Sequence, residues 1–132
     1  MAGYEPRVIQ PASVTSGSDG GGSNQVVLTL KGVTTPGPGA TVLLHGVVSG
    51  IASSGSGIQA QLWIVRGDTS GGHQLTGDVN VNVVAGQEWS LPFLFEDEPG
   101  DVASLDYSLV LWMENATAAG SITYASVGGL VS

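Results

Sequence analysis

The chain has 132 residues, enough for one domain that buries about two thirds of the surface its unfolded form exposes. Only 3 residues are Lys or Arg against 11 Asp or Glu, and this charge of −8 excludes nucleic acid as a partner, because phosphates are bound by clustered cations. Charged residues make up only 11% of the chain, and the absence of Cys excludes disulfides and cysteine-bound metals. A surface with so few charged residues and so much Gly is typical of a protein that is covered in an assembly.

The first 24 residues predict an extended N-terminal arm rather than part of a core. Residues 11–24 read PASVTSGSDGGGSN, which has too few apolar side chains to offset the entropy lost on ordering. We therefore expect residues 1–24 to form the arm and residues 25–132 to form a β-sandwich domain. The side chains expected to anchor the arm on a neighbouring subunit or a shell are Tyr4, Val8, Ile9 and Val14.

From residue 25 onward, short runs of Val, Ile and Leu are broken by Gly, Pro, Ser and Asp, which is typical of strands and turns. Strands are expected over residues 25–31, 40–49, 58–66, 78–84, 88–95, 105–114 and 120–131, with a short one at 7–10. Seven to eight strands at such intervals predict an all-β fold, an antiparallel β-sandwich that is jelly-roll-like. No uninterrupted apolar stretch is long enough to predict a membrane span.

The alternation of side chains along a strand indicates which of its faces are covered. In DVNVNVV, residues 78–84, Val alternates with Asp and Asn, which predicts one solvated face. The segments 58–66 and 105–114 instead carry apolar side chains on one face and a large indole, Trp63 or Trp112, on the other. Such strands predict a subunit interface at the two indoles, or else a cover of loops or of the N-terminal arm, and both alternatives stay open.

The segment FEDEPGD, residues 95–101, gathers four carboxylates in a chain with few charges. The alternation of the preceding strand predicts that Glu96 and Glu98 point outward and that Asp97 points the other way. A wet Pro-Gly turn does not suit acid–base catalysis, and the Asp/Asn alternation of calcium loops is absent, so a solvated turn is the favoured interpretation. Calcium binding is a weaker alternative, with the candidate ligands Glu96, Asp97, Glu98 and Asp101.

No motif predicts an enzyme or a cofactor. The only histidines, His45 and His73, match no paired-histidine metal spacing, and the nucleophile elbow and the phosphate loop are both absent. The tripeptide Arg66-Gly67-Asp68 matches the sequence read by integrin receptors, but an Arg that ends a strand before a Gly-Asp turn explains the same residues.

The three tryptophans suggest a second class of function. Trp89 alternates with Leu91 and Phe93 on an expected core face, which leaves Trp63 and Trp112 as a pair on which sugar rings could stack. A carbohydrate-binding β-sandwich module, as in a head fibre or a tail-associated adhesin, is therefore the alternative function.

The C-terminal half also carries a family-like pattern. An acidic Pro-Gly turn precedes a strand with Tyr107, Leu109 and Leu111, and a small-residue turn, residues 118–120, precedes a last apolar strand. This pattern resembles the end of jelly-roll virion proteins of tailed bacteriophages, including capsid decoration or cement proteins.

The resemblance implies a structural virion protein that binds the outer surface of a phage head and stabilises the contacts between capsomers. It implies a homotrimer with the major capsid protein as partner, no nucleic acid, no membrane and no catalytic residue. It also implies a location on the capsid surface after assembly in the host cytoplasm. On this interpretation FEDEPGD is a turn displayed at one end of the sandwich.

Overall fold

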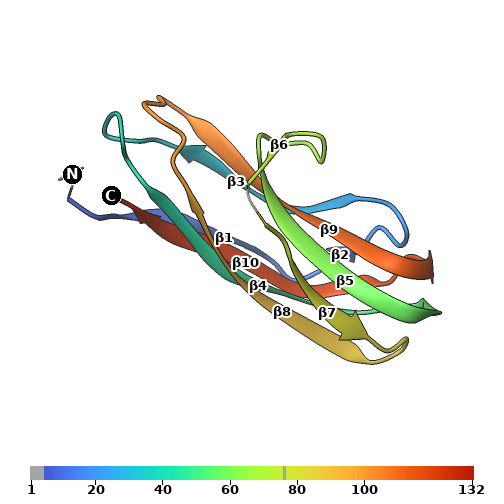
Figure 1. Cartoon of the computed structure of the whole chain (residues 1–132). Coiled ribbons are helices and arrows are strands. Elements are labelled where there is room, and N and C mark those ends of the chain that lie inside the picture. Colours follow the sequence, from blue (N-terminus) through green and yellow to red (C-terminus); the bar gives the residue numbers. More distant parts are fainter. Residues whose placement is uncertain (1–4, 76) are drawn as a thin grey trace.

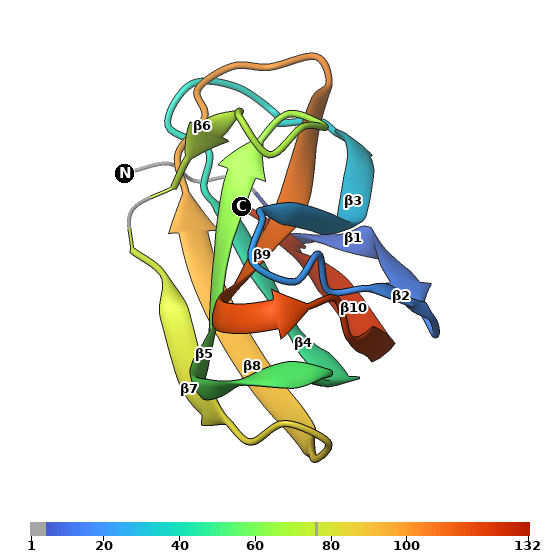
Figure 2. The ribbon, with the colours of Figure 1, turned by 90° about the vertical axis from the view of Figure 1, so that its right-hand side faces the viewer.

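The computed structural model describes residues 5–75 and 77–132, which form two antiparallel sheets packed face to face (Figures 1 and 2). No helix in these two ranges is long and apolar enough to cross a membrane. The strands are β1 (Arg7–Val14), β2 (Gly17–Ser18), β3 (Gln25–Val33), β4 (Val42–Ile51), β5 (Ser54–Arg66), β6 (His73–Gln74), β7 (Val79–Val83), β8 (Glu88–Asp97), β9 (Leu105–Ala118) and β10 (Ser121–Val131). The predicted strands are therefore present, and the predicted all-β sandwich is confirmed.

The strand order is that of a jelly roll. One sheet, called the β4 sheet below, has the order β1-β10-β4-β8, with β2 beside β10. The other, called the β5 sheet, has the order β3-β9-β5-β6, and β7 also pairs with β5. The pairs are nested, since β1 pairs with β10, β3 with β9, β4 with β8 and β5 with β7. One long hairpin with its tip between β5 and β7 has thus been rolled into a sandwich.

The core between the sheets follows the alternation of the strands. Along β8 every second residue is buried, and these residues include Trp89, Leu91, Phe93 and Phe95, as expected. They meet the inward residues of β5 and β9 in one continuous apolar cluster. Each fully buried side chain of this kind contributes about 1.5–3 kcal/mol through the hydrophobic effect.

Residues 7–19 belong to the sandwich, so the expectation of a separate arm does not hold for them. β1 pairs with β10 of the same chain from Arg7↔Val131 to Val14↔Ala125. Ile9 is buried in the core and Val14 packs against it, whereas Val8 points outward and is 74% exposed. Tyr4, the remaining expected anchor, lies outside the described residues.

Backbone hydrogen bonds and one carboxylate hold the Gly/Ser tract that follows β1. Asp19 is only 1% exposed, and its Oδ1 accepts hydrogen bonds from the backbone N–H groups of Gly21 (2.9 Å) and Gly120 (2.8 Å). The backbone N–H of Asp19 donates to the carbonyl of Gly120 at 3.2 Å. The tract is therefore held in place by hydrogen bonds and not by apolar side chains. Its composition shows that apolar side chains are few, but it does not show these hydrogen bonds.

Gly46 in the middle of β4 permits the close packing of β8 and β10. It lies opposite Phe93 in β8, and a Cβ atom at Gly46 would lie 2.8 Å from Cζ of Phe93 and would overlap the carbonyl oxygen of Ser126. Neither neighbour can yield freely, because one is a core ring and the other is strand backbone.

Gly46→Ala is expected to lower the free energy of unfolding by about 1–3 kcal/mol, because an added methyl group overpacks the site. Urea unfolding followed by tryptophan fluorescence measures the loss. The matched control is Gly71→Ala, since a Cβ at Gly71 would meet no heavy atom within 4 Å. Equal stabilities for the two variants would contradict the packing argument.

Candidate interaction surfaces

Asp97 of the FEDEPGD segment is a buried link between the two sheets. It ends β8 and points inward, with its side chain only 6% exposed. Its carboxylate accepts two hydrogen bonds from Arg66 of β5, from Nε at 2.9 Å and from Nη2 at 2.6 Å. The hydroxyl of Tyr107 in β9 donates a third at 2.8 Å. The inward direction of Asp97 is as predicted, and its carboxylate is already engaged on both oxygens.

The charges of this network are fixed by their surroundings. Burial alone would raise the pKa of Asp97, but the hydrogen bonds from Arg66 and Tyr107 outweigh it and the pKa lies below its ordinary value. Burial and the hydrogen bond to Asp97 raise the pKa of Tyr107, so its hydroxyl remains a donor. The hydrogen bond to Asp97 raises the pKa of Arg66. A carboxylate held in its charged form by two donors serves as a structural link and not as a proton carrier.

The other three carboxylates of FEDEPGD do not join Asp97. Glu96 and Glu98 point outward, as predicted, and Asp101 is exposed in the connection to β9. Within residues 5–75 and 77–132, no three His, Asp or Glu side chains lie close enough together to hold a metal ion. Three of the four carboxylates therefore lie at the surface, and calcium binding by this segment stays an alternative prediction.

The Arg66-Gly67-Asp68 tripeptide is used within the fold. The Arg66 guanidinium is bound to Asp97, and the carbonyl of Gly67 accepts a hydrogen bond from the hydroxyl of Ser108 at 2.6 Å. Gly67 has a φ of 112°, a backbone conformation that residues other than glycine rarely adopt. Only Asp68 is freely exposed, so these contacts match a strand end followed by a turn.

Loss of the Asp97 carboxylate should change both stability and its dependence on pH. Because the folded pKa is lowered from 3.8, the stabilisation is complete above about pH 4 and is lost as the pH falls through the folded pKa. Asp97→Asn is expected to lower the free energy of unfolding at pH 7 by about 2 kcal/mol, the usual contribution of hydrogen bonds to a charged group.

Denaturant unfolding between pH 7 and pH 2 tests this prediction. The stability of the unmodified protein should fall more steeply below pH 4 than that of Asp97→Asn. Glu98→Gln, which changes an exposed neighbour, should retain the steep profile. Parallel profiles for the unmodified chain and Asp97→Asn would show that another group controls the acid response.

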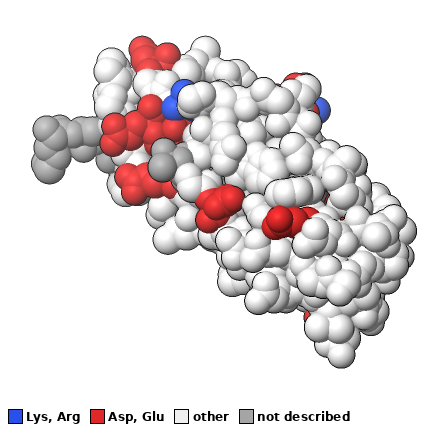
Figure 3. Space-filling view, turned by 45° about the vertical axis from the view of Figure 1, so that its right-hand side comes forward, with Lys and Arg blue, Asp and Glu red and all other residues white. Residues whose placement is uncertain are grey.

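Acidic side chains are not spread evenly over the surface. On the face shown in Figure 3 they gather toward the end of the molecule that carries the β5–β6 and β8–β9 connections, and the opposite end is nearly free of them. Surfaces away from the acidic end are therefore better suited to close contact, because fewer charges have to be desolvated there.

The outer face of the β4 sheet carries several exposed or half-buried apolar side chains. The register places Val8 opposite Leu130, Leu130 opposite Leu43, and Val47 opposite Pro92. Val8 is 74% exposed and Leu94, opposite His45, is 65% exposed. The acidic residues that point outward from this sheet, Glu88 and Glu96, both lie on the edge strand β8. We call this surface the apolar face, with the residues Val8, Leu43, Val47, Pro92, Leu94 and Leu130.

The outer face of the β5 sheet combines indoles with amides. Gln59 lies opposite Asn82 on β7 and Glu114 on β9, and Gln61 lies opposite Asn80 and Trp112 in the next row. Trp63 follows on β5, opposite Val110. We call this surface the amide–indole face, with the residues Gln59, Gln61, Trp63, Asn80, Asn82, Trp112 and Glu114.

Loops cover part of the amide–indole face, as one of the two sequence interpretations expected. The indole N–H of Trp112 donates to the carbonyl of Gly22 at 3.2 Å. Gly72 lies beside Val65, since a Cβ atom at Gly72 would lie 3.3 Å from Cβ of Val65, and Val65 is 1% exposed although it points away from the core. Trp63 and Trp112 themselves are only half-buried, and their predicted role in a subunit interface stays a prediction.

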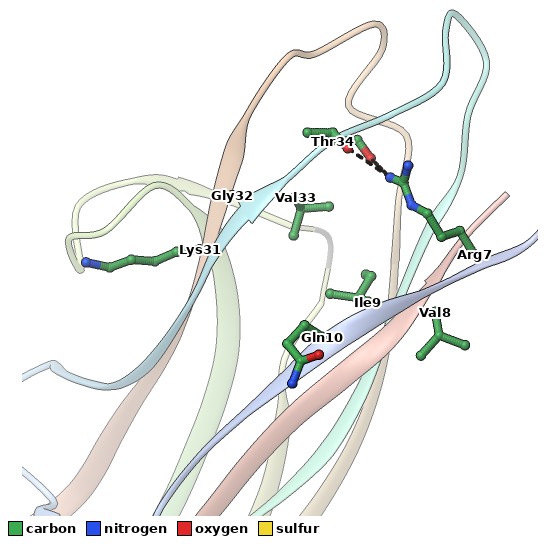
Figure 4. Close-up of a pocket in the computed structure, with 8 residues that line it drawn as sticks. All are labelled: Arg7, Val8, Ile9, Gln10, Lys31, Gly32, Val33 and Thr34. Atoms are coloured by element: carbon green, nitrogen blue, oxygen red, sulfur yellow. Dashed lines mark hydrogen bonds between the residues drawn. The ribbon is translucent and has the colours of Figure 1, made fainter.

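A groove of about 160 Å³ lies between β1 and β3, which belong to different sheets (Figure 4). Nη2 of Arg7 spans it and donates to the carbonyl oxygen and the hydroxyl of Thr34 at 2.6 and 2.9 Å. The side chain of Lys31 points away from Arg7 in Figure 4. The two cations do not converge, so this groove is a gap between sheet edges and not an anion site.

The comparisons with known proteins support the fold. No family model and no curated protein matches the sequence. The similar solved structures include the infectious bursal disease virus Gx strain, with a TM-score of 0.58, and the VP2 subviral particle of infectious bursal disease virus, with a TM-score of 0.54.

Both structures are 12% identical in sequence to this chain. They cover 97% and 96% of it, whereas the chain spans 36% and 32% of their own lengths. Identities this low establish a shared jelly-roll fold alone, because one fold hosts many functions.

Proposed function

We propose that the chain is a structural protein of a virus particle, and specifically a decoration protein that binds the outer surface of a phage head and stabilises capsomer contacts. The apolar face is the observation that carries this proposal, because it offers exposed apolar side chains with its acidic residues confined to one edge. The fold, which is shared with proteins of virus particles, and the sequence pattern that resembles phage decoration proteins support the same conclusion.

The energetics of the apolar face suit attachment to a shell. Full burial of a side chain such as Leu94 or Val8 is favourable by about 1.5–3 kcal/mol, so a few anchors dominate an interface. The centre of the face carries no Asp, Glu, Lys or Arg, so few charges have to be desolvated on contact. We take the major capsid protein as the partner on this face and the capsid surface as the location.

Pelleting with decoration-free phage heads, built from major capsid protein alone, tests the proposal. Leu94→Asp is expected to weaken co-sedimentation by about tenfold or more, because it places a charge where an apolar side chain should be buried. The matched control is Val84→Asp, since Val84 is 61% exposed but lies in the β7–β8 turn, outside the apolar face. Equal binding by the two variants would exclude the apolar face as the attachment surface.

The resemblance further leads us to propose a homotrimer. Multi-angle light scattering of the purified chain at micromolar concentration should give the mass of three chains of 13.3 kDa each. A trimer that persists in Leu94→Asp would place the contact between subunits outside the apolar face. A stable monomer in the unmodified chain would contradict a preformed trimer.

A further inference from the structure

The amide–indole face has a chemistry that the attachment of a decoration protein does not explain. Four amide side chains, one carboxylate and two half-buried indoles lie on three adjacent strands, β7, β5 and β9. An ordinary subunit interface would leave many of these donors and acceptors buried without partners, which is unfavourable. The face is thus better suited to a ligand that is itself rich in hydrogen-bonding groups.

The polar part of this face is already ordered. Nε2 of Gln61 donates to Oε2 of Glu114 at 2.8 Å and to Oε1 of Gln59 at 3.1 Å. These bonds leave Oε1 of Gln61, Nε2 of Gln59 and Oε1 of Glu114 without a hydrogen-bond partner in the described part of the chain. Because the side chains are held before any ligand arrives, binding would lose less side-chain entropy.

The two indoles lie next to the amide side chain of Gln61. Trp112 lies directly opposite Gln61, and its ring is fixed by the hydrogen bond from its N–H to Gly22. Trp63 lies two residues beyond Gln61 on β5 and points to the same side. Three strands at about 4.8 Å spacing and five residues at about 3.4 Å rise give this platform an extent of roughly 10 Å by 14 Å, which leaves room for a short oligosaccharide.

We propose that the amide–indole face binds a neutral oligosaccharide. The apolar C–H face of a pyranose ring stacks on an indole, as aromatic side chains favour flat apolar partners. Its hydroxyl groups both donate and accept, which matches amides that carry an NH₂ donor and a carbonyl acceptor, and a carboxylate that accepts.

The charge of the face selects among glycans. Arg66, the cationic residue on the described strands β5, β7 and β9, is bound to Asp97 and does not face the platform. Glu114 adds a negative charge to the platform. Sulfated or sialylated sugars would therefore be repelled. The platform and the apolar face lie on opposite sheets of the sandwich, so the chain can hold a shell and a glycan together (Figure 2).

The test is an array of neutral glucans, mannans and galactans beside sialylated and sulfated glycans, probed with the purified full-length chain. Retention of at least one neutral glycan and of no acidic one is expected. Binding of acidic glycans alone, or of none, would overturn the proposal. The Leu94→Asp variant should bind the same glycan, which separates this result from the attachment of the chain to a shell.

Calorimetric titration of the bound glycan into variants locates the site. Trp63→Ala should weaken binding at least tenfold, and so should the double change Asn80→Ala and Asn82→Ala, which alters exposed side chains only. Tyr124→Ala is the matched control, because this 42% exposed aromatic residue lies on the β4 sheet. Affinity that is unchanged in the Asn80 and Asn82 double variant would overturn the assignment, even if Trp63→Ala proved unstable.

Discussion

The carboxylate of Asp97 joins the two sheets at one end of the sandwich. The structural roles of two sequence motifs, FEDEPGD and Arg66-Gly67-Asp68, depend on it. It belongs to β8, whereas its donors Arg66 and Tyr107 belong to β5 and β9 of the other sheet. A buried charge is stable only where such donors satisfy it. The link therefore uses the central carboxylate of FEDEPGD and the first residue of Arg66-Gly67-Asp68 for structure, and the remaining surfaces become the candidates for function.

Those surfaces differ in chemistry because the two sheets expose different side chains. The β4 sheet presents Val8 and Leu94 outward, whereas the β5 sheet presents Gln61 and Trp63. Removing water from an apolar sheet face is favourable in itself. Removing water from a face of amides is favourable only when each amide forms a hydrogen bond with the partner. One molecule thus offers a surface suited to permanent contact and a second suited to reversible recognition.

The strands could be predicted from sequence because each carries its own local signal, such as the alternation in β8 that also placed Asp97 inward. The partners of Asp97 could not, since Arg66 and Tyr107 approach it only after the chain has rolled up. The indole pair of the amide–indole face could be predicted from the alternation of its strands, but its amides could not, because Asn80 and Gln61 become neighbours only through the register of β7 on β5.

The N-terminal segment was misjudged for a related reason. Its composition records missing apolar side chains but not the backbone bonds to β10 or the buried Asp19. Segments that are held through their main chain carry little signal in their residue types.

The nested pairing of strands also has a kinetic consequence. β1 is synthesised first of the ten strands, yet its partner β10 is the last, and β3 similarly waits for β9 (Figure 1). Contacts between residues so distant in sequence slow folding, because a long loop must close before any of them forms. The ribosome must therefore complete β10 before the sandwich can close, and until then the apolar side of β1 lacks its partner strand and is prone to aggregation.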